Sequence, residues 1–596
     1  MAVVVAAAVV LGSVVVPDRV SEPSARPVQM DLQQSAPVAP VQRDTYTCAT
    51  YSGIERPNPV QNLYRDTFAW GTTPPYRVGD GHGDVNWRLN PADNPSWYMW
   101  LHSLRWLGQG IRAAGKGDRR ALRRVDAIAH DWMRDNPYPW ADDAGATEPT
   151  MHRTNVLICL RQAVLSGLRV TRLPPAYRWI DTALVQHAQF LQRNWSGDWN
   201  HGTEESLALF GVGCTLGRAD LKRTAADRLT AGIKTAIDAQ GSTNEQSTAY
   251  AQYNYSLWGR AIDVLGKCGV DASPTIKARR QQLANWLALA TNSLGYLHQL
   301  GDSEVVRTVP VAGTPLEYAG MLGKRGTAPT QRVGIYAAGY VFGRTGWGSE
   351  RPFDAESTYS IRFGPVRRLH GHDDHMSITY TALGRDVLVD GGHAGYQGDA
   401  AQRWARGQTA HNVMTVSGAG ASATQLTRSV VRETSEFYEL HDAGRTRGVL
   451  VLKDPDLMVV LDRGTSAVRR RYETLWHLPA EQRVTPYGAG SVVAQRPGDS
   501  VKTVLLQIPY GDPVSAARVT SSWQYRTIDK RSAAPVVSFT RSGRSASILS
   551  VIVPAQATSV VSYTTSQQAG QTLVHLQVGA VRTTVAISPD GTLRRA

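Results

Sequence analysis

The stretch that decides the fold is His370–Tyr380, which reads HGHDDHMSITY. Three histidines and two aspartates fall within its first six residues, and the chain then turns into an apolar run typical of a β-strand. A solvated polar loop is the simplest interpretation of this cluster, and a metal or acid–base site is the alternative. His370 and His372 are two residues apart, so on a strand their side chains would point the same way.

The hydrophobic pattern differs on the two sides of this stretch. Residues 55–300 contain about eight amphipathic segments of helical period, joined by short turns. In residues 96–115, for example, large apolar residues recur every three or four positions after Ser96, as in a capped helix. From residue 334 onward, short alternating runs punctuated by Gly, Asp and Pro predict antiparallel sheets packed on one another. The sequence therefore predicts a helical half followed by a β-sandwich half.

Length and charge narrow the class of partner. A chain of 596 residues is too long for one core, so two or more domains are expected. The net charge of +14 indicates an anionic partner: nucleic acid, a membrane surface or an acidic polymer. Nucleic acid is the weakest of the three, because the sequence has no Lys/Arg block and no zinc-finger, helix-turn-helix or RNP-like pattern.

The N-terminal residues resemble an export segment. An apolar run of about 15 residues is too short to span a membrane comfortably and resembles the core of a secretory signal, although a basic flank is missing. Residues 21–42 are rich in Pro, Ser and Gln and are typical of a flexible spacer. We expect a secreted, cell-surface or periplasmic protein, whose only membrane contact is a possible N-terminal anchor. The predicted domains are 1–45 (signal or anchor and spacer), 46–330 (helical) and 331–596 (β-sandwich).

The four cysteines show no metal-binding or redox spacing. Cys48, Cys159, Cys214 and Cys268 form no CxxC pair and are too few for a disulfide scaffold. Cys159 and Cys214 lie in apolar helical runs, where we expect them to be small buried hydrophobic residues.

Five motifs in a fixed order add a family resemblance. They are HGHDDHMS at 370–377 with VLVDGG at 387–392 and TAHNVM at 409–414, WNHGTEES at 199–206, EQSTAYAQY at 245–253, QLGDSE at 299–304 and GYVFGRTGW at 339–347. In these motifs the chain resembles the heparinase II/III family of polysaccharide lyases, which includes heparinase-like and alginate lyase-like enzymes, from about residue 60 to the C-terminus. The resemblance implies an N-terminal (α/α) toroid, a C-terminal antiparallel β-sandwich and an active site in the cleft between them.

The chemistry of such a lyase agrees with the helical motifs. Removing the C5 proton of a uronic acid places a second negative charge beside a carboxylate, so the enzyme must neutralise that carboxylate. Asn200 and His201 suit this task, because an amide and an imidazole can each donate a hydrogen bond to carboxylate oxygens. The alternative is structural, since an Asn-His before a helix is more often a cap. The order of the motifs favours the catalytic interpretation.

The resemblance also implies a catalytic tyrosine and a catalytic histidine. Tyr250 and Tyr253 are three residues apart and share a helix face, and the spacing from Asn200 slightly favours Tyr253, with Tyr255 left open. Aromatic residues at this spacing are otherwise usually core residues. His370 would be a second general base, or an acid, from the β-domain.

A zinc site follows from the same resemblance. It assigns the metal to His372, Asp390 and His411, which leaves His370 to face the substrate. Two imidazoles and a carboxylate are a ligand set typical of zinc, with a water or a fourth group completing the tetrahedron. We expect one structural zinc per chain, which holds the wall of the cleft.

Four residues are candidates for substrate binding. Arg403 and Arg406 directly precede the predicted ligand His411, and an arginine can hold a carboxylate or sulfate through two parallel hydrogen bonds. Tyr396 can supply the aromatic residue that the family often has where this chain has Gly392-His393. Glu204 belongs to the WNHGTEES motif, although it most simply complements the N-terminus of a helix.

The sequence therefore predicts a polysaccharide lyase that cleaves an acidic polysaccharide, such as a glycosaminoglycan or alginate, by β-elimination. One alternative is a zinc-dependent glycoside hydrolase that uses the same ligands catalytically. The other is a non-catalytic acidic-polysaccharide-binding protein of lyase ancestry. The sequence leaves the particular sugar and the oligomeric state open.

Overall fold

The computed structural model describes residues 46, 48, 50–71, 73–91, 93–140, 147–511, 513–528 and 530–596. The expected signal or anchor segment and spacer, residues 1–45, lie outside these residues. The chain divides into two compact units: residues up to Ala236 together with Leu257–Lys277, and Ile237–Ser256 together with Ala278–Ala596. The domain boundary predicted at residue 330 stays a prediction.

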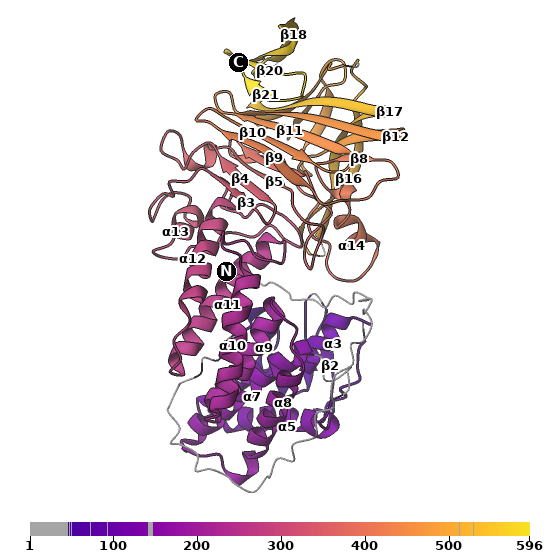
Figure 1. Ribbon diagram of the computed structural model, residues 1–596. Helices are drawn as coiled ribbons and strands as arrows, with labels where there is room; N and C mark the ends of the chain where they lie inside the picture. Colours follow the sequence, from indigo (N-terminus) through magenta and orange to yellow (C-terminus); the bar gives the residue numbers. More distant parts are fainter. Residues whose placement is uncertain are drawn as a thin grey trace. The chain divides into compact units, whose positions relative to one another are not determined.

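The N-terminal part of the chain is helical, as predicted. Figure 1 shows α7, α8, α9 and α10 as neighbouring helices of the first unit. The helices are α1 Ser52–Glu55, α2 Val60–Leu63, α3 Pro95–His102, α4 Gly108–Gly115, α5 Arg119–Asp135, α7 Thr147–Leu168, α8 Trp179–Arg193, α9 Asn200–Thr215, α10 Ala219–Ala236, α11 Thr248–Lys267, α12 Pro274–Leu289 and α13 Pro315–Gly320, with short 3₁₀ turns at Arg105–Leu107, Pro175–Tyr177, Phe353–Ala355 and Gln408–Ala410. A two-stranded ribbon, β1 Thr67–Phe68 and β2 Tyr76–Arg77, also belongs to this unit. Across the described part of the chain, no helix combines the length and the hydropathy that a membrane span needs.

The helix predicted over residues 96–115 is divided in two. Its cap is Asn94, not Ser96: the Asn94 side chain accepts hydrogen bonds from the backbone N–H groups of Ser96 and Trp97. The helix ends at His102, and Leu104 adopts a left-handed conformation with φ 56° before a new helix starts at Gly108. Burial explains the break, because Leu104 is fully buried and the apolar spacing is kept across the interruption.

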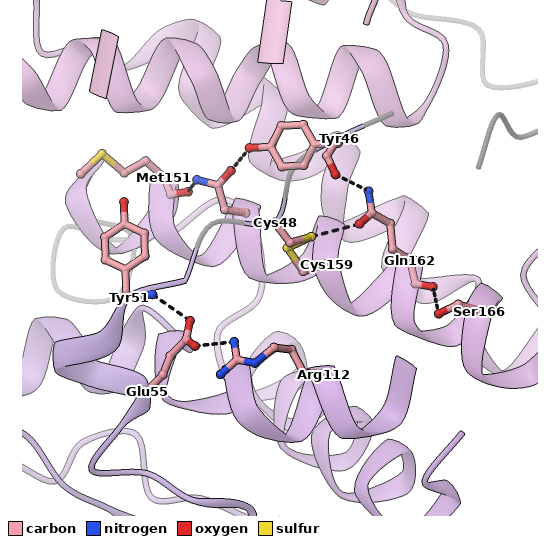
Figure 2. The surroundings of a disulfide bond; sticks show 10 residues. Tyr46, Cys48, Tyr51, Glu55, Arg112, Met151, Cys159, Gln162 and Ser166 are labelled. Atoms are coloured by element: carbon pink, nitrogen blue, oxygen red, sulfur yellow. Dashed lines mark hydrogen bonds and ion pairs between the residues drawn. A yellow bond between two sulfur atoms is a disulfide. The ribbon is translucent and has the colours of Figure 1, made fainter. Parts of the chain in front are cut away.

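All four cysteines form disulfides, which corrects the expectation that Cys159 and Cys214 are free hydrophobic residues. Cys48 is bonded to Cys159 and Cys214 to Cys268. The sequence separations of 111 and 54 residues hide both pairs from local motif analysis. Figure 2 shows the Cys48–Cys159 bond next to Gln162, which donates a hydrogen bond of 3.2 Å to the backbone carbonyl of Tyr46.

The C-terminal part of the chain is built of antiparallel sheets, as predicted. Its strands are β3 Val333–Tyr336, β4 Tyr340–Arg344, β5 Thr358–Arg362, β6 Ile378–Ala382, β7 Arg385–Leu388, β8 Met414–Val416, β9 Gln425–Val431, β10 Ser435–His441, β11 Arg445–Leu452, β12 Leu457–His477, β13 Arg483–Pro486, β14 Val492–Gln495, β15 Val501–Ile508, β16 Arg518–Thr527, β17 Lys530–Gln556, β18 Val561–Gln568, β19 Gln571–Val578, β20 Val581–Ile587 and β21 Leu593–Arg595; one short helix, α14 Ala400–Ala405, interrupts them. The described strands form a five-stranded sheet (β3 to β7), a four-stranded sheet (β18 to β21) and a ten-stranded sheet in the order β13-β14-β15-β17-β12-β11-β10-β9, with β16 paired to β17 and β8 to β12. Figure 1 shows β10, β11, β12 and β17 of the large sheet side by side.

The central strands of the ten-stranded sheet are buried on both faces. Neighbouring side chains of a strand point to opposite faces. In β10, Tyr438 and Leu440 therefore join the core shared with the five-stranded sheet, while Phe437 joins the core shared with the four-stranded sheet. Burying a large apolar side chain contributes about 1.5–3 kcal/mol, so these two cores supply much of the unit's stability. The predicted sandwich is confirmed, and the four-stranded sheet adds a third layer to it.

Candidate active site

The HGHDDH segment is a loop between β5 and β6, not a strand as its alternating histidines suggested. His370 and His372 are nevertheless both buried and both contact Asp302. The residue between them must be small, because a Cβ on Gly371 would lie 2.2 Å from the side-chain oxygen of Gln246. The close packing of this loop, rather than strand periodicity, brings the two imidazoles together.

Asp302 is the centre of a buried charge cluster in the second unit. Its Oδ1 lies 3.0 Å from Nε2 of His372 and 3.2 Å from Nδ1 of His393, and its Oδ2 lies 3.1 Å from Nδ1 of His370. The guanidinium of Arg406 donates to both oxygens. Burial opposes ionisation, but the charge of His393 and the hydrogen bonds from His370 and His372 hold the pKa of Asp302 well below its ordinary value.

His370 is enclosed by two tyrosines and two carboxylates. Its ring stacks on that of Tyr250 at 3.5 Å between centroids and 10° between planes. The Tyr250 hydroxyl is 2.8 Å from the hydroxyl of Tyr396, which is itself 3.4 Å from Nδ1 of His370. On the other side, Nε2 of His370 lies 3.6 Å from Glu245. Burial and the neighbouring Tyr250 raise the pKa of Tyr396 well above its ordinary value, so its hydroxyl remains a proton donor.

The contacts distinguish the two candidate tyrosines. Both lie on α11, but the tyrosine that stacks on His370 is Tyr250, and the ring of Tyr253 is 6.5 Å from that of Tyr250. A hydroxyl that shares a network with the predicted catalytic histidine is the better-placed proton-transfer group. The geometry therefore favours Tyr250, although sequence spacing slightly favours Tyr253.

The three predicted metal ligands lie together. His372, Asp390 and His411 each offer one donor atom, and these atoms are all within 4.8 Å of one another. Nδ1 of His372 and Nε2 of His411 are buried, and neither has a hydrogen-bond partner among the described residues. Burial lowers the pKa of His372, which favours the neutral form that binds metals. These residues fit a zinc ion held by three protein ligands.

The surroundings of this group fix its geometry. Asp390 accepts a hydrogen bond of 2.8 Å from Nδ1 of His411. Asn412, the next residue, donates to the backbone carbonyls of Ile378 and Val389 and accepts from the N–H of His477. The Asn of the TAHNVM motif therefore ties together the segments that carry the predicted ligands.

Asn200 and His201 belong to the other unit. They open α9, where Asn200 is buried and His201 stacks on Trp199 at 4.1 Å. Nε2 of His201 is 3.8 Å from the carboxylate of Glu148. Burial and the charge of Glu205 raise the pKa of Glu148 to about 8. Glu148 therefore carries a proton at neutral pH in the folded protein.

Three of the predicted substrate-binding residues form hydrogen bonds or ion pairs with other residues of the chain. Glu204 is buried, accepts a 2.9 Å hydrogen bond from the Tyr51 hydroxyl and forms an ion pair with Arg260. Arg406 is bound to Asp302, and its side chain is only 13% exposed. Arg403, on α14, donates from Nη1 to the carbonyl of Gly398 at 2.5 Å. Their roles as substrate contacts stay predictions.

Sequence reasoning missed Asp302 and Glu148. Asp302 lies in the QLGDSE motif, but the motif alone assigns no role to this residue. Glu148 opens α7 in a segment where no pattern predicted a buried acid.

A helical region followed by antiparallel sheets is the architecture that the motif resemblance implies. Residues 338–570 match the family model described as Heparinase II/III-like, C-terminal. The resemblance predicted from the motifs is therefore confirmed over this part of the chain. A comparison with curated protein sequences finds no match.

Solved structures of lyases share the fold. A mutant of the heparan sulfate lyase HepC from Pedobacter heparinus aligns with a TM-score of 0.71 and 16% identity, over 94% of this chain and 90% of its own. Heparinase III aligns with a TM-score of 0.78 and 15% identity, over 93% and 94%. The chondroitin AC lyase of Streptomyces coelicolor A3 aligns with a TM-score of 0.51 and 11% identity, over 84% and 86%. At these identities the likeness establishes the fold.

Proposed function

We propose that the protein is a polysaccharide lyase that cleaves an acidic, uronic-acid-containing polysaccharide by β-elimination. The observation that carries this proposal is the Tyr250–His370–Tyr396 network, in which Tyr250 and His370 are buried and Tyr396 is half-buried, beside the predicted metal ligands. Two adjacent groups able to exchange protons suit a reaction that removes one proton and delivers another. The family match and the lyase structures of the same fold support it.

In the proposed reaction, His370 and Tyr250 each carry out one of the two proton transfers. One of these two side chains accepts the C5 proton, and the electron pair of that C–H bond forms the C4–C5 double bond. The C4–O bond breaks, and the leaving oxygen accepts a proton from the second of the two side chains. Asn200 and His201 donate hydrogen bonds to the substrate carboxylate, which lowers the cost of the charge that develops beside it.

A zinc ion on His372, Asp390 and His411 would be structural in this proposal. When bound, it would cross-link the loops that follow β5, β7 and α14 and so hold His370 in place. The net charge of +14 and the arginines near the site support an anionic polymer as the substrate.

Export is part of the proposal. Disulfides persist in oxidising environments outside the cytoplasm, and this chain forms two of them. An enzyme for extracellular polysaccharide would need to be secreted, held at the cell surface or placed in the periplasm.

The test is incubation with heparan sulfate, chondroitin sulfate, hyaluronan and alginate, followed by ultraviolet absorbance. Elimination creates a conjugated double bond, so at least one polymer should give a rise in absorbance. His370→Ala is the inactive control. Reducing ends formed without absorbance would support the zinc-dependent hydrolase instead. Binding of a polymer without cleavage would support the non-catalytic alternative.

A further inference from the structure

Asp302 accepts hydrogen bonds on both oxygens from groups with different tasks. His370 belongs to the proposed proton-transfer network, and His372 is a predicted metal ligand. The carboxylate is fully buried, with a side-chain exposure of 0%. One side chain therefore connects the two parts of the site.

The contacts of Asp302 determine which nitrogen of each imidazole carries a proton. An ionised carboxylate only accepts, so the nitrogen facing it must be the N–H. In His370 that nitrogen is Nδ1, and in His372 it is Nε2. The two histidines thus present opposite ring nitrogens to Asp302 as N–H donors. Nε2 of His370 is left to face Glu245, at 3.6 Å, and Nδ1 of His372 is left for another ligand.

A separate observation agrees with this assignment. Nδ1 of His372 is buried without a hydrogen-bond partner among the described residues, and His372 belongs to the His372–Asp390–His411 group. With Nε2 bound to Asp302, Nδ1 is the nitrogen that His372 can offer to that group.

A cation on Asp302 itself is the competing interpretation. Asp302, His372 and His393 also offer donor atoms within 4.8 Å of one another. The Arg406 guanidinium, however, forms two hydrogen bonds with the same carboxylate and already supplies the positive charge. A metal there would face this charge at close range, so the hydrogen-bonded arrangement is favoured.

We propose that Asp302 is a positioning residue that holds His370 through Nδ1–H and His372 through Nε2–H and thereby links the proton-transfer network to the predicted metal ligands. The catalytic half of this inference rests on the proposed function. The positioning half concerns the folded protein alone.

The matched control is Asp374→Asn. Asp374 is another buried aspartate, in the loop that carries His370 and His372, but its hydrogen bonds come from Arg362 rather than from an imidazole. In protein labelled with ¹⁵N-histidine, two-bond ¹H–¹⁵N correlations should show a proton on Nδ1 of His370 and on Nε2 of His372. Asp302→Asn should change the ¹⁵N shifts of at least one of these two nitrogens, and Asp374→Asn should change neither. Unchanged shifts of both nitrogens in Asp302→Asn would overturn the proposal.

Kinetics test the coupling. Asp302→Asn should lower kcat by about 100-fold or more with KM changed by no more than about threefold, because only the reacting geometry is lost. An equal loss of kcat in Asp374→Asn, or wild-type kcat in Asp302→Asn, would contradict the proposal. If wild type cleaves no polymer, the proposed function fails, and the ¹⁵N shifts of the two imidazoles still decide the role of Asp302.

Discussion

Two buried carboxylates, one in each compact unit, are in opposite protonation states. Glu148 of the helical unit lies beside His201 and has its pKa raised to about 8 by burial and by Glu205. Asp302 of the β-rich unit is equally buried, but three imidazoles and one guanidinium keep it ionised. Burial alone therefore does not decide the charge of an acid, and the neighbouring groups do.

The difference corresponds to different tasks in the proposed reaction. A protonated Glu148 beside His201 adds no further negative charge that would repel the substrate carboxylate. In the second unit, a permanent negative charge on Asp302 orients imidazoles. The four predictions below test this division, from the largest expected effect to the smallest.

The largest effect is expected from the tyrosines of the second unit. Tyr250→Phe removes the hydroxyl in the network with Tyr396 and His370, and turnover should fall by about 10³-fold or more, as expected for losing an acid–base group. Tyr253→Phe is the matched variant on the same helix and should lose much less. Initial rates on the cleaved polymer decide between them, and the reverse ranking would move the catalytic hydroxyl one helical turn.

In the helical unit, Asn200→Ala and His201→Ala should each lower turnover by about 10²–10³-fold, the scale of losing a preorganised hydrogen-bond donor. Circular dichroism and melting temperature should stay near wild type. Near wild-type turnover in both variants would show that Asn200 and His201 of the first unit take no part in the proposed reaction.

The predicted metal ligands should respond together. His372→Ala, Asp390→Ala and His411→Ala should each lose the roughly one equivalent of zinc expected of a three-ligand site and melt several degrees lower. His370→Ala should keep the metal and lose activity. Elemental analysis and calorimetry measure both quantities. If wild-type protein contains no metal and the three variants melt at the wild-type temperature, these residues form a hydrogen-bonded cluster and no metal site.

The smallest effect concerns Glu148 and the pH dependence of stability. Its pKa is higher in the folded state than the ordinary 4.5, so its contribution to stability is complete below about pH 4.5 and is lost as the pH rises to about 8. Glu148→Gln is neutral at every pH. The variant should therefore melt a few degrees above wild type at pH 8 to 9, and the two should converge near pH 5.

Asp442 provides a control of opposite sign. Burial opposes its ionisation, but hydrogen bonds and the charge of Arg445 lower its pKa, so its contribution is present at neutral pH and is lost on acidification. Asp442→Asn should be less stable than wild type at pH 7, with a gap that narrows as the pH falls. A Glu148→Gln variant with the same pH trend as Asp442→Asn would contradict the account of Glu148.

Sequence reasoning reached the features that are local along the chain. The change from helical to alternating periodicity predicted the helical half and the β-sheet half of the chain. The His370–His372 and His411–Asn412 motifs predicted residues that the structure places in the candidate site. It did not reach features that depend on distant packing. Asp302 is 68 residues from His370, and the disulfides join residues 111 and 54 apart. The two histidines converge through a loop that no periodicity describes.

The central claim is cleavage by elimination rather than by hydrolysis. Digestion in water enriched in heavy oxygen, followed by mass spectrometry of the oligosaccharides, tests it directly. A lyase adds no water, so the products should contain no heavy oxygen at the cleaved bond, and each new non-reducing end should be an unsaturated uronate. Incorporation of one heavy oxygen per cleavage, with saturated ends, would contradict the account.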